Sequence, residues 1–270
     1  MKPVYVGTSG WSYKGWEKAF YPTDIPKNRH FEYYLSQFPT VEINLTFYRL
    51  PTQRSVREWR DKAPSGFIYA LKGSRFITHM KKLANLNGAL ENFFARIDPL
   101  KPRMGPVLWQ LPRLLKKDTH RLADFLQRLP KGLRYAMEFR HPSWLDDEIF
   151  ALLQRYRVAH VWLSSGSMPA NLTVTAGFIY IRFHGLSGGA AHDYTVAELE
   201  PWATHILNHP DKTVFAYFNN DINTRAPHNA RQLMEMVGPR AEKAFARPTD
   251  LLKRRRSTTP EARLKRIPAL

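Results

Sequence analysis

Five charged side chains stand within or directly after short apolar runs that have the composition of β-strands. They are Glu42, Lys72, Glu138, Arg140 and Arg182. Two carboxylates that converge suit general acid/base catalysis if one of them raises the pKa of the other. The three cations outnumber the two carboxylates, so a site made of these residues favours an anionic ligand that carries a phosphate or a carboxylate group. We therefore take Glu42 and Glu138 as candidate acid/base groups.

The alternation of polar and apolar residues predicts that these groups share one side of their strands. Side chains along a strand point to opposite faces in turn. Glu42 and Asn44 alternate with Val41, Ile43 and Leu45, which we expect to pack against helices. The same spacing recurs in the other runs. The polar residues that it assigns to the inward face are Glu42, Asn44, Lys72, Gln110, Glu138, Arg140, Arg182, His184 and Asn219.

Eight β-type runs position these residues, and they alternate with segments of helical periodicity. Phe31, Tyr34, Leu35 and Phe38, for example, follow the i, i+3, i+4, i+7 spacing of an amphipathic helix. Eight strand–helix alternations in about 240 residues predict an α/β fold, a single (β/α)8 TIM-type barrel. The expected strands are residues 4–9, 40–45, 67–72, 106–110, 135–139, 160–164, 178–184 and 213–219.

A doubly wound open sheet is the alternative fold. It normally has fewer strands and a glycine-rich first turn that binds a dinucleotide. The first turn here, residues 7–11, lacks that spacing. In a barrel, enzymes build their sites at the carboxyl ends of the strands, and at least five strands bring a charged or amide residue there. A buried unpaired charge costs several kcal/mol, so these groups must pair with one another or with a ligand.

A purely structural ion-pair network is the competing interpretation of the same residues. In that network, Glu42 and Glu138 are neutralised by Lys72, Arg140 and Arg182. It must explain why five strands bring such residues to one end of the barrel, when apolar residues of equal volume often stabilise a protein as well. We prefer a ligand site.

A divalent metal held by Glu42, Glu138, His184 and Asp221 is a further alternative. The neighbouring cations oppose another positive charge, and only one inward histidine is available. We therefore expect no metal. We place Lys72 and His184 beside the reacting atoms instead.

Residues outside the strands extend the candidate ligand site. Arg75 follows the third run and adds a cation for anion binding. Trp11 and Tyr48 lie near strand ends, where aromatic rings beside basic groups stack on a base or a sugar, although core packing also explains such rings. Residues 185–189 (GLSGG) offer backbone N–H groups to a phosphate. The expected ligand-binding residues are Trp11, Asn44, Tyr48, Arg75, Gln110, Arg140, Arg182, Asn219 and Asp221.

The composition excludes several classes of protein. The chain has 270 residues, 43% of them hydrophobic, and no cysteine. It therefore has no disulfide, thiolate zinc site or cysteine nucleophile, and it has enough apolar residues for a core. No apolar stretch approaches the ~20 residues of a membrane span, and residues 1–6 (MKPVYV) do not begin a signal peptide, so we expect a cytoplasmic protein with no membrane partner. No motif indicates a cofactor or an oligomeric state.

The positive charge is concentrated in two parts of the chain. The formal net charge is +18, and residues 51–134 hold 18 basic and 6 acidic residues. Residues 239–270 hold 10 basic and 3 acidic residues, including the run 253–256 (KRRR). Such segments favour a polyanion such as nucleic acid, although a solvated basic surface is the other interpretation. We expect a barrel domain over residues 1–238 and a basic C-terminal extension over residues 239–270, flexible from about residue 245.

Seven stretches occur in the order of a known family. They are residues 7–13 (GTSGWSY), 41–48 (VEINLTFY), 72–79 (KGSRFITH), 105–112 (GPVLWQLP), 138–144 (EFRHPSW), 182–185 (RFHG) and 217–221 (YFNND). They resemble the YecE-like proteins, domain-of-unknown-function family 72 (DUF72). The resemblance spans about residues 4–237 and implies a TIM-type barrel. It implies no activity, because the biochemical role of the family is unsettled, and likeness to barrel endonucleases and sugar isomerases is an analogy of fold.

Three functions are consistent with the sequence. The first is an enzyme of hydrolase, lyase or isomerase type, which uses the paired glutamates on a small anionic substrate at the mouth of the barrel. The second is a nucleic-acid-binding or nucleic-acid-processing protein, which uses residues 51–134 and the C-terminal tail. The third is a protein that binds a metabolite without catalysis. The location of the basic excess, at the mouth or on the helical exterior, separates the first two.

Overall fold

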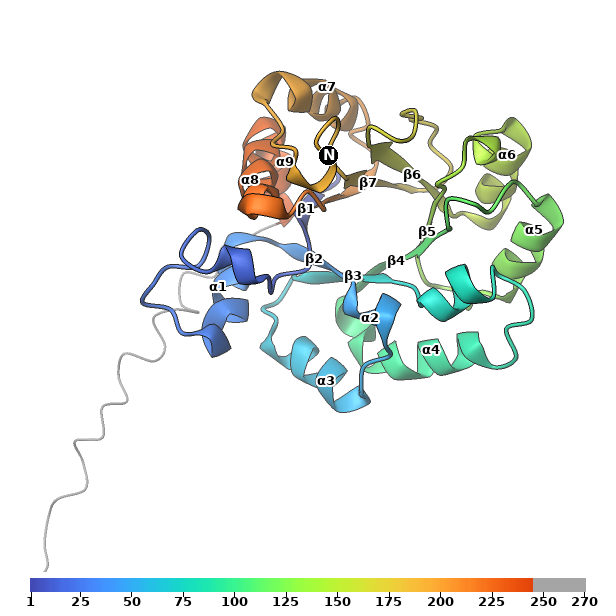
Figure 1. The fold of residues 1–270 in the computed structure, drawn as a ribbon, viewed down its shortest axis with the longest axis horizontal. Coiled ribbons are helices and arrows are strands. Elements are labelled where there is room, and N and C mark those ends of the chain that lie inside the picture. Colours follow the sequence, from blue (N-terminus) through green and yellow to red (C-terminus); the bar gives the residue numbers. More distant parts are fainter. Residues whose placement is uncertain (245–270) are drawn as a thin grey trace, which may run out of the picture.

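Eight parallel strands hydrogen-bond in sequence order, and the eighth pairs with the first as well as with the seventh. The sheet therefore closes into a barrel, which confirms the predicted (β/α)8 TIM-type fold (Figure 1). The computed structural model describes residues 1–244. Its strands are β1 (Val4–Ser9), β2 (Thr40–Ile43), β3 (Ile68–Lys72), β4 (Met104–Gln110), β5 (Tyr135–Glu138), β6 (Ala159–Ser164), β7 (Phe178–Phe183) and β8 (Thr213–Phe218).

Helices surround the barrel. The longer ones are α1 (His30–Gln37), α3 (Gln53–Lys62), α4 (Ala89–Ile97), α5 (Thr119–Arg128), α6 (Asp147–Tyr156), α7 (Val196–Leu207) and α8 (Arg225–Val237). Two shorter helices are α2 (Leu45–Tyr48), directly after β2, and α9 (Pro239–Ala244), after α8. Within residues 1–244, no helix links β6 to β7, so the connection there is an irregular loop over residues 165–177.

A threonine hydroxyl fixes the end of this loop against β6. Thr175 Oγ1 donates to the carbonyl of Val158 at 2.6 Å and accepts from the backbone N–H of His160 at 2.7 Å. The loop sequence (SGSMPANLTVTAG) holds two glycines and a proline without an apolar stripe, which favours irregular backbone. Seven longer helices therefore follow the eight strands within the described part of the chain.

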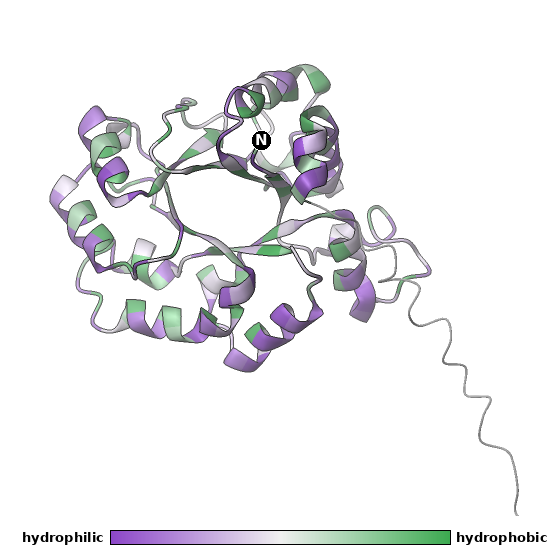
Figure 2. Ribbon diagram, turned by 180° about the vertical axis from the view of Figure 1, so that it is seen from behind, coloured by the Kyte–Doolittle hydropathy of each residue, from purple (hydrophilic) through white to green (hydrophobic). Residues whose placement is uncertain are grey.

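Two separate apolar layers confirm the predicted alternation along the strands. The larger layer lies between the strands and the helices, and it includes Val41 and Ile43 of β2. The smaller layer fills the barrel interior. Its fully buried members are Ala70, Leu108, Ala136, Tyr180, Phe215 and Tyr217. In Figure 2, hydrophobic colour follows much of the strands, and hydrophilic colour covers much of the helical exterior.

The second strand ends earlier than expected, at Ile43. Leu45 begins α2 and is 38% exposed, so the expectation that it packs on helices as a strand residue was wrong. Thr46 Oγ1 donates to the carbonyl of Lys72 at 2.6 Å and thereby ties α2 to the end of β3. The strand therefore ends here because of a hydrogen bond to Lys72, which lies 26 residues away in the sequence.

The last described helix packs at the end of the barrel where the strands begin. Arg240 of α9 is 1% exposed and donates to the carbonyls of Lys2, Ile206, His209 and Lys212. Residues 239–244 therefore contact the barrel, although we had placed them in the C-terminal extension. The tail expected from about residue 245, including residues 253–256, lies outside the described residues. In the part that is described, no helix has the length and apolar character needed to cross a membrane.

Candidate functional site

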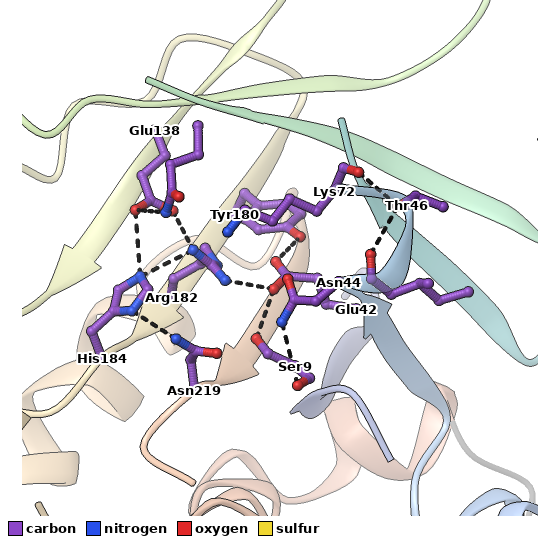
Figure 3. A network of polar contacts seen from close by, with 12 residues as sticks. Ser9, Glu42, Asn44, Thr46, Lys72, Glu138, Tyr180, Arg182, His184 and Asn219 are labelled. Atoms are coloured by element: carbon purple, nitrogen blue, oxygen red, sulfur yellow. Dashed lines mark hydrogen bonds and ion pairs between the residues drawn. The ribbon is translucent and has the colours of Figure 1, made fainter. Parts of the chain in front are cut away.

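One guanidinium bridges two glutamates across the barrel interior (Figure 3). Arg182 points inward from β7, and its Nη2 donates to Glu42 Oε1 of β2 at 2.7 Å. Its Nη1 donates to Glu138 Oε2 of β5 at 2.6 Å. All three side chains are 0% exposed. Glu42 and Glu138 therefore meet on the two sides of Arg182.

Two hydroxyl groups complete the environment of Glu42. Ser9 Oγ donates to Oε1 at 2.6 Å, and Tyr180 OH donates to Oε2 at 2.6 Å. Burial alone would raise the pKa of Glu42, but the charge of Arg182 and these hydrogen bonds lower it below its usual value. Glu42 is therefore a carboxylate at neutral pH.

Glu138 is held in the same form by stronger partners. Gln110 Nε2 donates to its Oε1 at 2.7 Å, and Arg140 Nε pairs with the same oxygen. Burial opposes ionisation, but Arg140 and Arg182 outweigh it and hold the pKa of Glu138 well below its usual value. The acid/base role that we expected for the paired glutamates required one raised pKa, and the pKa of each glutamate is lowered instead.

His184 lies at the outer edge of this network, directly after β7. Arg140 Nη2 lies 2.9 Å from its Nε2, and Arg182 Nη1 lies 3.1 Å from the same atom. Asn219 Nδ2 lies 3.1 Å from its Nδ1. Burial and the charge of Arg182 lower the pKa of His184 to about 4. The imidazole is therefore neutral at pH 7, and the two guanidinium groups make Nε2 the hydrogen-bond acceptor.

Lys72 is the inward cation without an ionic partner. It ends β3 and is 8% exposed, and its Nζ forms no hydrogen bond or ion pair within residues 1–244. The ammonium lies over the ring of Phe47, 4.2 Å from the ring centroid. Burial and the charge of Arg182 lower the pKa of Lys72 to about 8. Figure 3 shows the side chain extending from β3 toward Tyr180 and Arg182.

A cavity of about 450 Å³ opens beside His184 between the loops that follow β6 and β7. Arg113, Arg140 and Asn219 line it together with His184, and no Asp or Glu side chain of residues 1–244 does. The rest of the wall consists of three serines, three glycines and two apolar residues, which are Ser165, Ser167, Ser187, Gly166, Gly185, Gly189, Leu186 and Ala190. A cavity with two arginines, several hydroxyl donors and no carboxylate suits an anion.

Glycine allows the two loops to approach each other closely. A Cβ on Gly166 would lie 2.7 Å from the carbonyl oxygen of Leu186. Gly185 has a φ of +85°, and a Cβ there would lie 1.7 Å from the carbonyl oxygen of Gly189. Tyr194 OH braces the same loop, since it accepts from the Gly185 N–H at 2.9 Å. The shape of the cavity wall therefore depends on glycine at these two positions.

The structure brings nine of the predicted site residues to the C-terminal end of the barrel interior. Asn44 is among them, and its Nδ2 donates to the Ser9 carbonyl at 3.4 Å while its Oδ1 is buried without a partner in the described chain. The nine are Glu42, Asn44, Lys72, Gln110, Glu138, Arg140, Arg182, His184 and Asn219.

Four predicted residues lie outside this network. Trp11 packs against Phe31 in the outer layer, with ring centroids 4.6 Å apart, so it is a packing residue. Asp221 accepts a hydrogen bond from Trp16 Nε1. Tyr48, the last residue of α2, and Arg75, which follows β3, are both exposed. Within residues 1–244, no three His, Asp or Glu side chains gather around a possible metal, so the alternative metal site with Asp221 does not assemble.

Three residues of the site were missing from the predicted set. Ser9 and Tyr180 both bind Glu42, and both follow from strand alternation, which places them on the inward face of β1 and β7. Arg113 lines the cavity from the loop after β4, three positions beyond Gln110. No periodic signal indicates the direction of a loop residue, so the sequence could not have identified Arg113.

Comparison with known proteins places the chain in a family. A family model described as "Protein of unknown function DUF72" matches residues 5–254. UPF0759 protein YunF of Bacillus subtilis is 26% identical over 269 residues, which cover 87% of this chain and 94% of YunF. UPF0759 protein YecE of Escherichia coli is 30% identical over 142 residues, which cover 52% of this chain and 50% of YecE.

A solved structure agrees with these sequence matches. The crystal structure of a DUF72 family protein from Thermotoga maritima superimposes with a TM-score of 0.80 and 27% identity. The superposition covers 87% of this chain and 99% of the Thermotoga maritima chain. The resemblance drawn from the seven sequence stretches is thereby confirmed. The family model matches nearly the whole chain, and the chain folds into a closed TIM-type barrel. The chain therefore belongs to the DUF72 family of proteins of unknown function.

Proposed function

We propose that this protein is an enzyme that binds a phosphate- or carboxylate-bearing substrate at the C-terminal mouth of the barrel and transfers a proton through Lys72. The observation that carries the proposal is the cavity beside His184, which Arg113 and Arg140 line and which no carboxylate in the described part of the chain lines. An anion placed there receives charge-assisted hydrogen bonds from both guanidinium groups, and Glu138 already orients that of Arg140.

Lys72 is the group best suited to move a proton in this mouth. A general base works best when its pKa lies near the operating pH, and burial lowers the pKa of Lys72 to about 8. Its ammonium forms no ion pair within the described chain, so a bond to a substrate atom would replace no ion pair. In the neutral form it accepts a proton, and in the charged form it stabilises developing negative charge.

Glu42 and Glu138 serve as positioning residues in this proposal. Each carboxylate binds Arg182, and Glu138 also binds Arg140, so the glutamates fix the orientation of both guanidinium groups. A charge held in place before the substrate arrives needs no reorganisation during the reaction. His184 is neutral and adds a polar contact beside the anion without a competing charge.

Binding of inorganic phosphate and of acetate, measured by isothermal titration calorimetry, tests the anion site. We expect Arg113→Ala to weaken phosphate binding by roughly tenfold, the effect of one charged hydrogen bond. Lys116→Ala is the matched control, because Lys116 is an exposed cation of the same loop that does not line the cavity. Equal losses in the two variants, or no binding of either anion by the wild type, would overturn the proposal.

Turnover tests the role of Lys72. A panel of phosphorylated and carboxylated metabolites is incubated with wild-type protein and with Lys72→Met, and products are read by mass spectrometry. For any compound consumed, we expect kcat/KM of the wild type to rise with pH to a plateau above about pH 8, and Lys72→Met to lose at least about 100-fold. Equal turnover by both proteins would contradict the assignment, and tight binding without turnover would identify a metabolite-binding protein.

The compartment expected from the sequence, the cytoplasm, stays a prediction.

A further inference from the structure

The mouth of the barrel carries its excess positive charge on one half. The loops that follow β2, β3, β4 and β5 span residues 44–52, 73–88, 111–118 and 139–146. They contain two acidic residues, which are the helix-capping Asp118 and Asp146. Their eight basic residues are Arg49, Arg75, Lys81, Lys82, Arg113, Lys116, Lys117 and Arg140.

The opposite half of the mouth is balanced. The loops after β6, β7, β8 and β1 hold four basic and four acidic residues in residues 165–177, 184–195, 219–224 and 10–29. On the basic half, all of the cations except Lys117 and Arg140 are exposed and form no ion pair within residues 1–244. Charges of one sign that are gathered on one side of a site attract an extended anion of the opposite sign.

A second cavity, of about 410 Å³, opens within this basic half between the loops after β2 and β3 and the start of α4. Tyr48 and Phe76 line it, and they are 72% and 42% exposed. Asn87 and Asn92 line the same cavity. Exposed aromatic rings beside amide groups provide a stacking surface and hydrogen bonds for an unpaired base.

A chain of contacts connects this cavity to the proposed catalytic lysine. The ring of Tyr48 meets the ring of Phe47 edge-on, with centroids 5.0 Å apart. The ring of Phe47 also contacts the Lys72 ammonium, 4.2 Å from the ring centroid, and the imidazole of His79. A ring that stacks on Tyr48 is therefore separated from Lys72 by two aromatic residues, Tyr48 and Phe47.

We infer that the substrate of this mouth is a single-stranded nucleic acid, one base of which stacks on Tyr48 and Phe76 while the cations after β2 to β5 bind its phosphates. The inference rests on the proposed function, because it names the substrate class of the same mouth. A duplex keeps its bases stacked on one another, so a base enters such a cavity only from an unpaired strand. Arg113 and Arg140 then receive a phosphate of the same strand.

Fluorescence anisotropy with a labelled single-stranded oligonucleotide of about 12 nucleotides tests the inference. The mouth variant is Arg75→Ala/Lys81→Ala/Lys82→Ala. Its matched control is Lys62→Ala/Arg128→Ala/Lys131→Ala, three exposed cations without an ion pair in the described chain that lie toward the other end of the barrel. Both proteins keep residues 245–270, so the charge of the tail is the same in each.

We expect the mouth variant to lose at least about tenfold more affinity than the control and to show a shallower dependence on salt, because fewer counterions are released on binding. Tyr48→Ala should weaken binding by about tenfold, while Tyr48→Phe keeps the ring and binds as the wild type does. Equal affinity of the two triple variants, or an unchanged Tyr48→Ala, would overturn the inference.

Two competitors separate this inference from the proposed function. If inorganic polyphosphate and heparin displace the oligonucleotide as well as the unlabelled strand does, the basic half of the mouth binds any polyanion. That result would overturn the inference that the substrate is a nucleic acid. If Arg113→Ala weakens phosphate binding but the protein binds no oligonucleotide, the result supports the anion site and contradicts the nucleic-acid inference. If Arg113→Ala binds the oligonucleotide as tightly as the wild type does, the strand binds the basic half of the mouth without using the anion site. The inference would then fail as stated.

Discussion

Arg182 and Glu42 form an ion pair across the barrel interior, with Nη2 and Oε1 2.7 Å apart, although 140 residues separate them in the chain. The same guanidinium binds Glu138, so three strands are joined through one side chain. Each partner is fully buried, which makes each charge dependent on the others. The consequences for stability and for the chemistry of the mouth can be measured separately.

Arg182→Met should destabilise the protein by about 3–5 kcal/mol, because it leaves two buried carboxylates without their shared partner. Urea denaturation followed by circular dichroism measures the loss. Arg54→Ala is the control, since Arg54 forms an exposed pair with Glu58 on α3 and its removal should change little. A free energy of unfolding for Arg182→Met within about 1 kcal/mol of the wild type would show that the carboxylates do not depend on Arg182.

Lys72 should make stability rise with pH above neutrality. Its pKa is about 8 in the folded chain against an ordinary value of 10.5, so the unfolded chain binds more protons between these values. The free energy of unfolding of the wild type, relative to that of Lys72→Met, should therefore increase from pH 8 to pH 10. The difference between the two proteins is the measured quantity, because tyrosines that titrate in the same range cancel in it. A constant difference would contradict the lowered pKa.

Asp221 should contribute the opposite slope at acid pH. Burial raises its pKa to about 6, and the hydrogen bond from Trp16 offsets this only in part. Between its ordinary value of 3.8 and about 6 the folded chain binds more protons, so the stabilising contribution is lost as pH rises through 6. Tryptophan fluorescence should titrate near pH 6 in the wild type, and this transition should be absent from Asp221→Asn. If Asp221→Asn still shows the fluorescence transition near pH 6, a group other than Asp221 causes it.

Gly185→Ala should remove the anion cavity. The new Cβ would lie 1.7 Å from the carbonyl oxygen of Gly189, so the loop after β7 must move. Gly132→Ala is the control, because Gly132 has a nearly equal φ of +83° and nothing within 4 Å of a Cβ. Both variants carry the backbone strain of about 1–2 kcal/mol, but only Gly185→Ala should lose phosphate binding in calorimetry. Equal phosphate affinity in the two variants would show that the loop does not form the site.

Strand alternation was sufficient to predict which side chains enter the barrel. Glu42, Arg182 and Ser9 follow from a period of two, because the backbone of a strand fixes that period. The partners of each charge did not follow from it. A guanidinium from β7 reaches β2 and β5 because of the curvature of the barrel and the length of the side chain, and both are properties of the assembled fold.

The errors in the sequence prediction have the same origin. Leu45 leaves the strand because Thr46 binds the backbone of Lys72, 26 residues away. The pKa of Glu138 is lowered by Arg140, two residues away, and also by Arg182, 44 residues away. Composition and periodicity describe neighbours along the chain, so they do not report contacts of this kind.

When Lys72 is neutral, the charges of the ionisable groups enclosed at the C-terminal end of the barrel interior sum to zero. Glu42 and Glu138 offset Arg140 and Arg182, and His184 is uncharged at pH 7. One proton on Lys72 therefore determines whether an incoming substrate meets a neutral or a positive interior. Substrate affinity and proton uptake are coupled through that single site, and an anion that enters above pH 8 should draw a proton from the solvent as it binds.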